Sequence, residues 1–428
     1  MYSLIKLIRK TYRMAEQEER KVVMKNFASL SALQAITYLL PVVILPYLFR
    51  TIGPEKFGLI AFAQAFVQYF MILTDYGFSI SATKEISLCR EEHDKVCAVF
   101  SSVMTVKIAL ALLSLLALSI IVYFVPRFRN DWMVYVFSFG AVIGNTLFPV
   151  WFFQGTEKMM HITNLNIFGG ALFTLAIFLF VKRPQDYLMV PLINSAVFLI
   201  TGVAGLRVVF RRFGVLFKFP GYGSLRQQLT AGWDIFISIV AVNAYTTTRI
   251  FTVGLLTTNA ITGFYSIAEK TANLIQTFPL ISFSQAIFPR LSKIFHRNTK
   301  KALEIMQHVQ RITTGISLIC LPLIFVSARW IVRFICGGDY PAAVLSLRLL
   351  LVSVFFISAN AFRVQFLLVC GKTHIYSRIH VVMALVGLPL IFLLIYSFSY
   401  VGAAIATVII EAGIFTITYV TVKKLKFS

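Results

Sequence analysis

The sequence predicts an all-α integral membrane protein, and three observations support this prediction. The 428 residues are 58% hydrophobic and only 13% charged. The apolar residues gather in runs of roughly 20 or more, the length that a helix needs to cross the hydrocarbon core of a bilayer. The segments between these runs are short, so little of the chain is left for a soluble domain.

Twelve runs are long and apolar enough to be membrane-spanning helices. They cover residues 26–49, 57–81, 98–125, 132–154, 164–181, 188–210, 230–256, 260–288, 309–336, 341–369, 378–398 and 401–421. We therefore expect two lobes of six helices each, an N-lobe over 26–210 and a C-lobe over 230–421. A basic N-terminal segment (1–25), a linker (211–229) and a short tail (422–428) are expected outside the lobes.

The positive charges predict the orientation of the chain. There are 40 Lys and Arg residues against 17 Asp and Glu residues, a formal net charge of +23. Most of this excess falls in 1–25, 211–229, 290–301 and 422–428. These four segments lie on one side if twelve spans alternate, and basic loops stay in the cytoplasm. Both termini are therefore predicted to be cytoplasmic, and we expect no nucleic-acid partner.

Two pairs of similar segments indicate that the halves of the chain are related. NTLFPVWFFQGTEK (145–158) is similar to NAFRVQFLLVCGKT (360–373), and FGLIAFAQAF (57–66) is similar to TGFYSIAEKT (262–271). Both pairs are separated by about half of the chain. Repeats in one orientation, each with an even number of spans, are a known transporter plan in which the substrate site lies between the repeats.

Charged side chains fall inside several predicted spans, where each costs at least about 3 kcal/mol at the bilayer centre. We expect these residues to line a wet internal cavity. The cations predicted to bind an anionic substrate there are Lys107, Arg249, Lys270 and Arg363. The carboxylates that are candidates for ion coupling are Asp75, Glu269 and Glu411.

Helical spacing places further polar side chains on inward faces of the spans. The residues expected to line the cavity are Gln34, Gln64, Gln68, Asn145, Asn243, Tyr245, Asn273 and Asn360. Such residues can instead form hydrogen bonds between neighbouring helices without touching a substrate. For Asp75, an equal alternative is an anchor for the basic loop residues Lys84 and Arg90.

The sequence shows no enzyme signature. We find no nucleotide-binding P-loop, no GxSxG motif and no DxD-type pair of carboxylates in a loop. The cysteine and histidine spacings match no zinc site, and the six histidines are expected to be solvated loop residues. We therefore expect no catalytic residue, metal or cofactor. Transport would depend on a gradient, an exchange or downhill flow.

Three segments carry a family resemblance: LLPVVILPYLFRTIGPEKFGLIAFAQAF (39–66), TDYGFSISATKEIS (74–87) and PVWFFQGTEKM (149–159). They are similar to the Wzx-type O-antigen flippases, which are polysaccharide transporters. The same superfamily holds the multidrug and toxin extrusion (MATE) exporters. NAYTTTRIFTVGLL (243–256) and VGAAIATVIIE (401–411) fit this family too. Arg249 departs from the family pattern, in which a neutral residue is more usual.

The resemblance implies a MATE-like, V-shaped fold of two six-helix lobes, acting as a monomer in the bacterial inner membrane. It also implies a substrate, an oligosaccharide repeat unit of O-antigen or a related polysaccharide, joined by diphosphate to undecaprenol. This substrate would move from the cytoplasmic to the periplasmic leaflet by alternating access. The implied partners are membrane lipids and the polysaccharide polymerase and chain-length regulator of the same pathway.

Two other functions stay open at this point. A drug or metabolite antiporter of the same architecture would favour an acidic cavity. A membrane-bound polysaccharide polymerase or ligase would need a sizeable periplasmic loop. The driving force is also open, since the membrane potential alone or proton or sodium antiport could drive an anion outward.

Overall fold

The computed structural model describes residues 40, 42–277 and 299–424. Within these ranges the regular structure is helical and no strand is present. Nine of the described helices are long and apolar enough to cross a membrane. The bounds of the helices are 42–75, α2 Phe78–Cys89, α3 His93–Phe124, α4 Pro126–Arg129, α5 Trp132–Leu147, α6 Val150–Gly155, α7 Met160–Phe180, η1 Pro184–Leu188, α8 Met189–Arg212, α9 Tyr222–Thr246, α10 Thr248–Leu256, 259–277, α12 Thr299–Cys336, α13 Pro341–Ser358, α14 Ala361–Val369 and α15 Thr373–Lys424.

Two of these helices contain a sharp turn that reverses the direction of the chain, so that each consists of two packed helical segments. The 52 residues of α15 would extend about 78 Å at 1.5 Å per residue, far more than one crossing requires. The helix reverses at Ser399, where φ is 54° and ψ is −138°. The reversal is tight, since a Cβ atom on Gly402 would lie 1.9 Å from the Leu394 carbonyl oxygen. The helix over 42–75 reverses in the same way at Gly53, which has φ of 77°.

These reversals reconcile the long helices with the twelve expected spans. The helix over 42–75, which reverses at Gly53, supplies two passes, and α15 supplies another two. The helix over 259–277 supplies one pass, and the other seven candidate spans supply one pass each. We call 42–52 span 1, 54–75 span 2 and 259–277 span 8. Parts of two expected spans, 26–39 and 278–288, lie outside the described residues.

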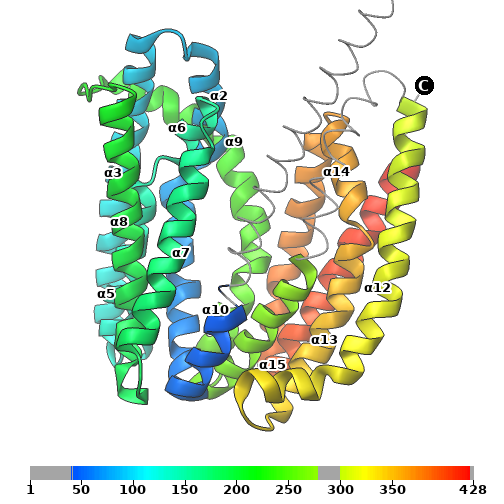
Figure 1. Ribbon diagram of the computed structural model, residues 1–428. Helices are drawn as coiled ribbons and strands as arrows, with labels where there is room; N and C mark the ends of the chain where they lie inside the picture. The colour runs from blue at the N-terminus through cyan, green and yellow to red at the C-terminus, as the bar shows by residue number, and fades with distance from the viewer. Residues whose placement is uncertain (1–39, 41, 278–298, 425–428) are drawn as a thin grey trace, which may run out of the picture.

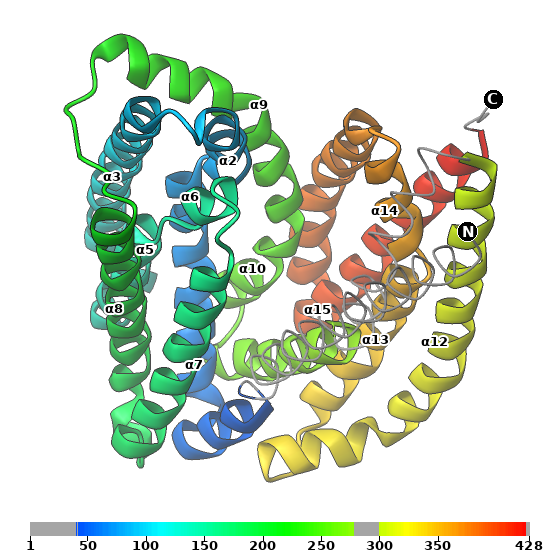
Figure 2. The same cartoon turned by 45° about the horizontal axis from the view of Figure 1, so that its top comes forward.

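The helices form two lobes, the N-lobe with helices up to α8 and the C-lobe with helices from α9 onward (Figure 1). The lobes converge where α12 ends and α13 begins, which we call the narrow end. They diverge toward the wide end, where α2, α6 and α14 lie, and Figure 2 shows the same divergence from another direction. The predicted all-α membrane fold of two lobes is confirmed.

Helix α9 connects the lobes. Its middle packs against the turn after span 2, where the rings of Tyr76 and Phe236 stack with centroids 4.8 Å apart. Gly232 permits this approach, because a Cβ atom there would lie 2.8 Å from the Tyr76 carbonyl oxygen. Near its other end, Tyr245 contacts α15. Residues 213–221, between α8 and α9, contain no helix.

The fourth span of each lobe is broken near the wide end. In the N-lobe, Pro149 separates α5 from α6, because proline lacks the N–H group that would continue the helix. In the C-lobe, Asn360 lies between α13 and α14 without a proline. The chain then turns with positive φ at Glu157 (59°) and at Gly371 (69°). The breaks therefore fall in the two segments, 145–158 and 360–373, that suggested related halves.

At the narrow end, span 2 of the N-lobe crosses span 8 of the C-lobe. A Cβ atom on Gly58 would lie 1.8 Å from the carbonyl oxygen of Asn259, and one on Gly263 would lie 2.1 Å from that of Pro54. Gly58 and Gly263 hold matching positions in the similar segments 57–66 and 262–271. The contact is thus reciprocal, which supports the internal repeat.

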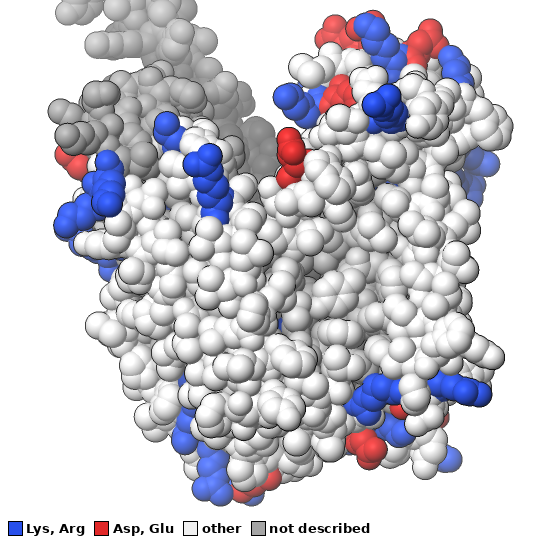
Figure 3. All heavy atoms as spheres, turned by 180° about the vertical axis from the view of Figure 1, so that it is seen from behind, with Lys and Arg blue, Asp and Glu red and all other residues white. Residues whose placement is uncertain are grey.

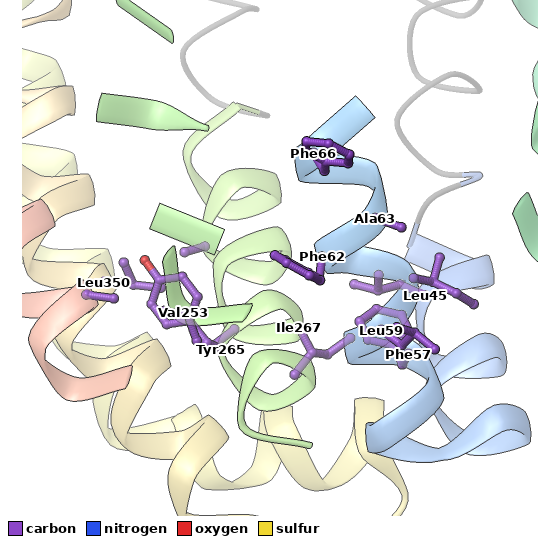
Figure 4. Close-up of a cluster of buried hydrophobic side chains, with 14 of the residues drawn as sticks. Leu45, Phe57, Leu59, Phe62, Ala63, Phe66, Val253, Tyr265, Ile267 and Leu350 are labelled. Atoms are coloured by element: carbon purple, nitrogen blue, oxygen red, sulfur yellow. The ribbon is translucent and has the colours of Figure 1, made fainter. Parts of the chain in front are cut away.

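Apolar side chains fill the seam beside this crossing. Figure 4 shows Phe62 of span 2 projecting toward Val253 of α10 and Ile267 of span 8. All three side chains are at most 1% exposed. The Phe62 ring also stacks on Phe251 of α10, with centroids 5.4 Å apart. Packed side chains from both lobes therefore close the narrow end.

Two arginines of the N-lobe reach across the same seam, and we call them the latch arginines. Arg50 donates a hydrogen bond to the Ile335 carbonyl oxygen (3.1 Å) near the end of α12. Arg127 donates to the Gly254 carbonyl oxygen (2.8 Å) near the end of α10 and to Asn259 Oδ1 (2.7 Å). The last carbonyls of a helix lack intrahelical donors, so both arginines satisfy groups that would otherwise need water.

The outer surface of the molecule suits a bilayer. In Figure 3 the middle of the visible face is almost free of charged side chains, whereas such side chains gather at both ends. Large apolar side chains such as Leu318, Leu323 and Val326 of α12 are exposed. Such a surface would promote aggregation in water but fits lipid. The protein is therefore a multi-pass membrane protein.

Candidate functional site

Two cavities adjoin between the lobes, and we call them the central cavities. They share four lining residues, Ala61 and Gln64 of span 2 and Lys270 and Asn273 of span 8. The larger, of about 490 Å³, extends among spans 1, 2 and 8, α7 and α8, with a mostly apolar lining. The smaller, of about 290 Å³, extends among span 2, α9, α10 and span 8. Lys270 thus lies where an apolar space meets a more polar one.

Lys270 is a half-buried cation at this junction. Its Nζ donates a weak hydrogen bond to Gln64 Oε1 (3.4 Å) across the lobes. It also lies 5.3 Å from the centre of the Phe57 ring. No carboxylate lies within ion-pair distance of Nζ among the described residues. The neighbouring Glu269 points elsewhere, because successive helical side chains diverge by about 100°. Lys270 is therefore available to an anion in the cavity.

Arg249 also lines the smaller cavity, but protein groups already satisfy much of its guanidinium. Its Nη2 forms an ion pair with Glu269 Oε1 at 3.1 Å, and the two side chains are only 12% and 7% exposed. Its Nη1 donates to Thr407 Oγ1 (3.0 Å) and its Nε to the Thr246 carbonyl oxygen (3.3 Å). Arg249 therefore ties α10 to span 8 and α15.

A second polar group lies inside the C-lobe. The Tyr245 hydroxyl shares a hydrogen bond of 2.8 Å with His380 Nδ1, and the Tyr376 ring packs 4.2 Å from the His380 ring. His380 is 8% exposed, so the expectation of a solvated loop histidine is wrong for this residue. The reason is that α15 begins at Thr373, which places His380 two turns inside the helix. Glu411 is half-buried, with no ion pair among the described residues.

Lys107 lies in the N-lobe, away from the central cavities. Its side chain is 2% exposed, and its Nζ lies 3.9 Å from Asp75 Oδ1 at the end of span 2. Asp75 therefore faces Lys107, whereas Arg90 pairs with Glu157 at 2.9 Å. A binding or coupling role for Lys107 and Asp75 stays a prediction.

The remaining predicted residues divide between several places. Gln68 lines the smaller central cavity, but Arg363 lines a different cavity in the C-lobe. Asn243 Nδ2 donates to the Ile239 carbonyl oxygen (2.9 Å) within α9. Asn145 and Asn360 line neither central cavity. Gln34 lies outside the described residues.

Sequence reasoning missed three polar residues of this region. Asn166 of α7 and Asn194 of α8 line the larger central cavity, and Thr407 of α15 accepts the hydrogen bond from Arg249. Each asparagine falls inside an otherwise apolar predicted span, which was a signal for an inward face.

Among the described residues, no group of three or more His, Cys, Asp or Glu side chains could hold a metal ion.

Comparison with known proteins establishes the family. The family model described as polysaccharide biosynthesis protein matches residues 23–295. The chain belongs to the polysaccharide biosynthesis protein family. It is 31% identical over 397 residues to a protein of Escherichia coli (strain K12) named "Putative O-antigen transporter", covering 90% of this chain and 93% of that protein. A Shigella dysenteriae protein of the same name is 25% identical over 393 residues, covering 90% and 96%.

Solved structures show the same fold for this family member. One is an inward-facing multidrug resistance MATE family transporter of the MOP superfamily, with a TM-score of 0.70, 12% identity and coverage of 90% of this chain and 94% of that chain. Another is the lipid II flippase MurJ in an inward closed conformation, with a TM-score of 0.72, 12% identity and coverage of 92% and 87%. The MATE-like exporter fold and the resemblance to Wzx-type flippases are confirmed.

Proposed function

We propose that this protein is a flippase that moves lipid-linked O-antigen or related polysaccharide repeat units across the bacterial inner membrane. Lys270 is the observation that carries the proposal. It is a cation without a carboxylate partner among the described residues, at the junction of two cavities between the lobes. The names of the relatives and the family membership support the class of cargo.

The lining of the central cavities suits the parts of such a substrate. The ammonium of Lys270 would donate charge-assisted hydrogen bonds that replace the water around a diphosphate. Amides such as Gln64, Asn166 and Asn194 would bind sugar hydroxyls. The apolar wall of the larger cavity would accommodate the first units of undecaprenol, while the rest of the tail stays in the bilayer. Arg249 would act indirectly, by holding span 8 in position.

We assign the wide end to the cytoplasm. Helices α8 and α15 end close to the wide end, and their last turns carry Arg211, Arg212, Lys423 and Lys424. Positively charged helix ends of this kind are typical of the cytoplasmic side of a membrane protein. The seam at the narrow end would then block the periplasmic side. Alternating access would require this seam to open while the lobes approach each other at the wide end. Other features assigned by resemblance, including the monomer, the polymerase and the chain-length regulator, belong to this proposal.

The central test is the substitution Lys270→Ala. Losing one charged hydrogen-bond donor costs roughly 1.5–3 kcal/mol, or about 10- to 100-fold in substrate affinity or rate. We expect Lys270→Ala to lower surface glycan in a flippase-null bacterium and to slow flipping in proteoliposomes, whereas Lys270→Arg retains most activity. Lys84→Ala, on the exposed face of α2, is the matched control. Normal flipping by Lys270→Ala at equal protein levels would overturn the proposal.

The driving force is tested separately. Each negative charge that leaves a negative cytoplasm gains about 2.3 kcal/mol per 100 mV, so the membrane potential alone can drive an anion outward. Flipping should therefore persist when the pH gradient is collapsed at fixed potential. If it stops, proton antiport through Asp75, Glu269 or Glu411 replaces this mechanism, and substituting each carboxylate by its amide identifies the carrier.

The alternatives fit the central cavities less well. A drug or metabolite antiporter for cations would need an uncompensated carboxylate there, whereas Glu269 is neutralised by Arg249. A polymerase or ligase would need room for two glycans outside the membrane. The described connections between helices at the narrow end are short, such as 337–340 between α12 and α13.

A further inference from the structure

A separate cavity of about 600 Å³ lies in the C-lobe toward the wide end. Its walls come from the first half of α12, from α14 and from the last turns of α15. Among the described residues, it shares no lining residue with the central cavities. We call it the C-lobe cavity.

Three cations from three helices line the C-lobe cavity. They are Arg311 of α12, Arg363 of α14 and Lys423 of α15, and no carboxylate is among the lining residues that the structure describes. Glu304, which is exposed on α12, does not line it. In the part of the chain that the structure describes, none of the three cations forms an ion pair. Their mutual repulsion would be relieved by a bound anion.

Arg363 is held in place before any ligand binds. Its guanidinium lies 5.2 Å from the Phe415 ring centre and 5.1 Å from that of Tyr419, and its Nη1 donates a hydrogen bond to the Ala359 carbonyl oxygen. A planar guanidinium fixed in this way retains further donors in the geometry that phosphate oxygens accept.

The wall beside Arg363 is rigid as well. The buried Gln310 donates from Nε2 to the Ser358 carbonyl oxygen (3.0 Å) and to Thr314 Oγ1 (3.2 Å), and its Oε1 accepts from the Phe362 N–H (3.1 Å). These bonds connect α12 to the break between α13 and α14. A preorganised wall lowers the entropic cost of binding a ligand.

The position of the C-lobe cavity indicates where its ligand lies. Lys423 lies one residue before the end of the last candidate membrane-spanning segment, His374–Lys424, and we therefore place the cavity at the level of lipid headgroups. Apolar Leu303, Met306 and Val422 line it beside the cations, as a ligand with both a phosphate and an apolar portion requires. We propose that the C-lobe cavity binds a phosphate group at the membrane surface, from an anionic lipid headgroup or from soluble phosphate. This site is additional to the substrate site proposed above and does not depend on it.

Binding to the full-length purified protein tests this site directly. Native mass spectrometry would compare retention of phosphatidylglycerol and of zwitterionic phosphatidylcholine. We expect about tenfold preference for phosphatidylglycerol, and its loss in the Arg311→Gln/Arg363→Gln/Lys423→Gln variant. The control Lys372→Gln/Arg378→Gln/Lys424→Gln removes three cations that do not line the cavity and should keep the preference. The single exposed substitution Lys423→Gln, which removes no packing, should lower the preference severalfold even if the triple variant folds poorly.

A competition arm separates the two sources of phosphate. One sample receives millimolar inorganic phosphate, and the control receives sodium chloride at the same ionic strength, without sulfate. If phosphate displaces phosphatidylglycerol from the wild type and chloride does not, the site binds soluble phosphate. If phosphate has no effect while the lipid preference persists, the ligand is the headgroup itself. Equal lipid retention by the wild type, the triple variant and Lys423→Gln, with no effect of phosphate, would overturn the proposal. Transport is not measured, so failure here leaves the flippase proposal untouched.

Discussion

Lys270 and Arg249 are both cations at the smaller central cavity, yet their surroundings give them different tasks. Arg249 contacts Glu269, Thr407 and a backbone carbonyl, whereas Lys270 has one weak hydrogen bond, to Gln64. A buried ion pair is costly to break, because removal of one partner leaves the other charge uncompensated. We therefore expect Arg249 to matter for stability and Lys270 for transport.

A double-mutant cycle tests the role of Arg249. We expect Arg249→Gln and Glu269→Gln to destabilise the protein by about 3–5 kcal/mol each, because each leaves a buried charge. The double variant Arg249→Gln/Glu269→Gln should recover much of this loss, since neither charge remains. Thermal unfolding of the purified proteins measures the effect, with Lys270→Gln as the control that changes the melting temperature little. Additive losses in the double variant would show that the pair does not act as a unit.

The sequence indicated the polar faces of the spans, but it could not show which helix each face meets. Helical spacing predicted inward positions for Gln64, Lys270 and Asn273, and all three line the central cavities. The same reasoning could not separate Lys107 from this set, because its partner Asp75 comes from another helix. Thr407 was missed, because one threonine in an apolar span is a common hydrogen-bond donor to its own helix.

At the scale of elements, the crossing of spans 2 and 8 depends on two glycines. Backbone atoms of each helix occupy the space where a side chain of the other would lie, at Gly58 and Gly263. The repeat predicted that these segments correspond, but sequence similarity alone could not show that they touch. The hydrophobic pattern predicted a break between 398 and 401, where Ser399 reverses the chain, but it did not predict the positive φ of this residue, because serine seldom adopts it.

Alanine substitutions test the crossing. Gly58→Ala or Gly263→Ala should force the lobes apart at the narrow end, since the new Cβ atom would overlap a carbonyl oxygen. In an ordinary helix the same change would stabilise by about 1 kcal/mol, so destabilisation must come from the crossing. We expect lower melting temperatures and slower flipping, whereas Gly221→Ala, where a Cβ atom meets nothing within 4 Å, is the control. A melting temperature at or above that of the wild type would contradict this contact.

For the molecule as a whole, the narrow end is closed in three ways: by the glycine crossing, the apolar seam and the latch arginines. The twelve spans and their division into lobes could be predicted, because hydropathy and repeats depend on the chain alone. The closed end could not, because it arises from contacts between residues such as Arg127 and Gly254 that are far apart in the sequence.

Distance measurements between spin labels test the latch arginines. Labels at Lys182 of the N-lobe and Arg333 of the C-lobe, both exposed, would report on the narrow end. We expect Arg50→Ala/Arg127→Ala to shift the distances toward longer values, because the carbonyls at the ends of α12 and α10 lose their donors. Each neutral or charged hydrogen bond contributes about 1–3 kcal/mol, enough to change the populations about tenfold. Arg129→Ala is the control, and unchanged distances in the double variant would rule out a latch.

The reciprocal crossing has a consequence for release of the cargo. Spans 2 and 8 both begin at the narrow end, at Pro54 and Asn259, and helix N-termini carry partial positive charge. When the seam separates, two such termini and the freed guanidinium groups of Arg50 and Arg127 would surround the exit. Electrostatic attraction to these groups would slow the release of a diphosphate. Salt ions weaken this attraction, because the screening length is only about 8 Å at physiological ionic strength. The rate of flipping should therefore rise with the ionic strength of the periplasm. In that case the salt concentration of this compartment would regulate how fast glycan reaches the cell surface.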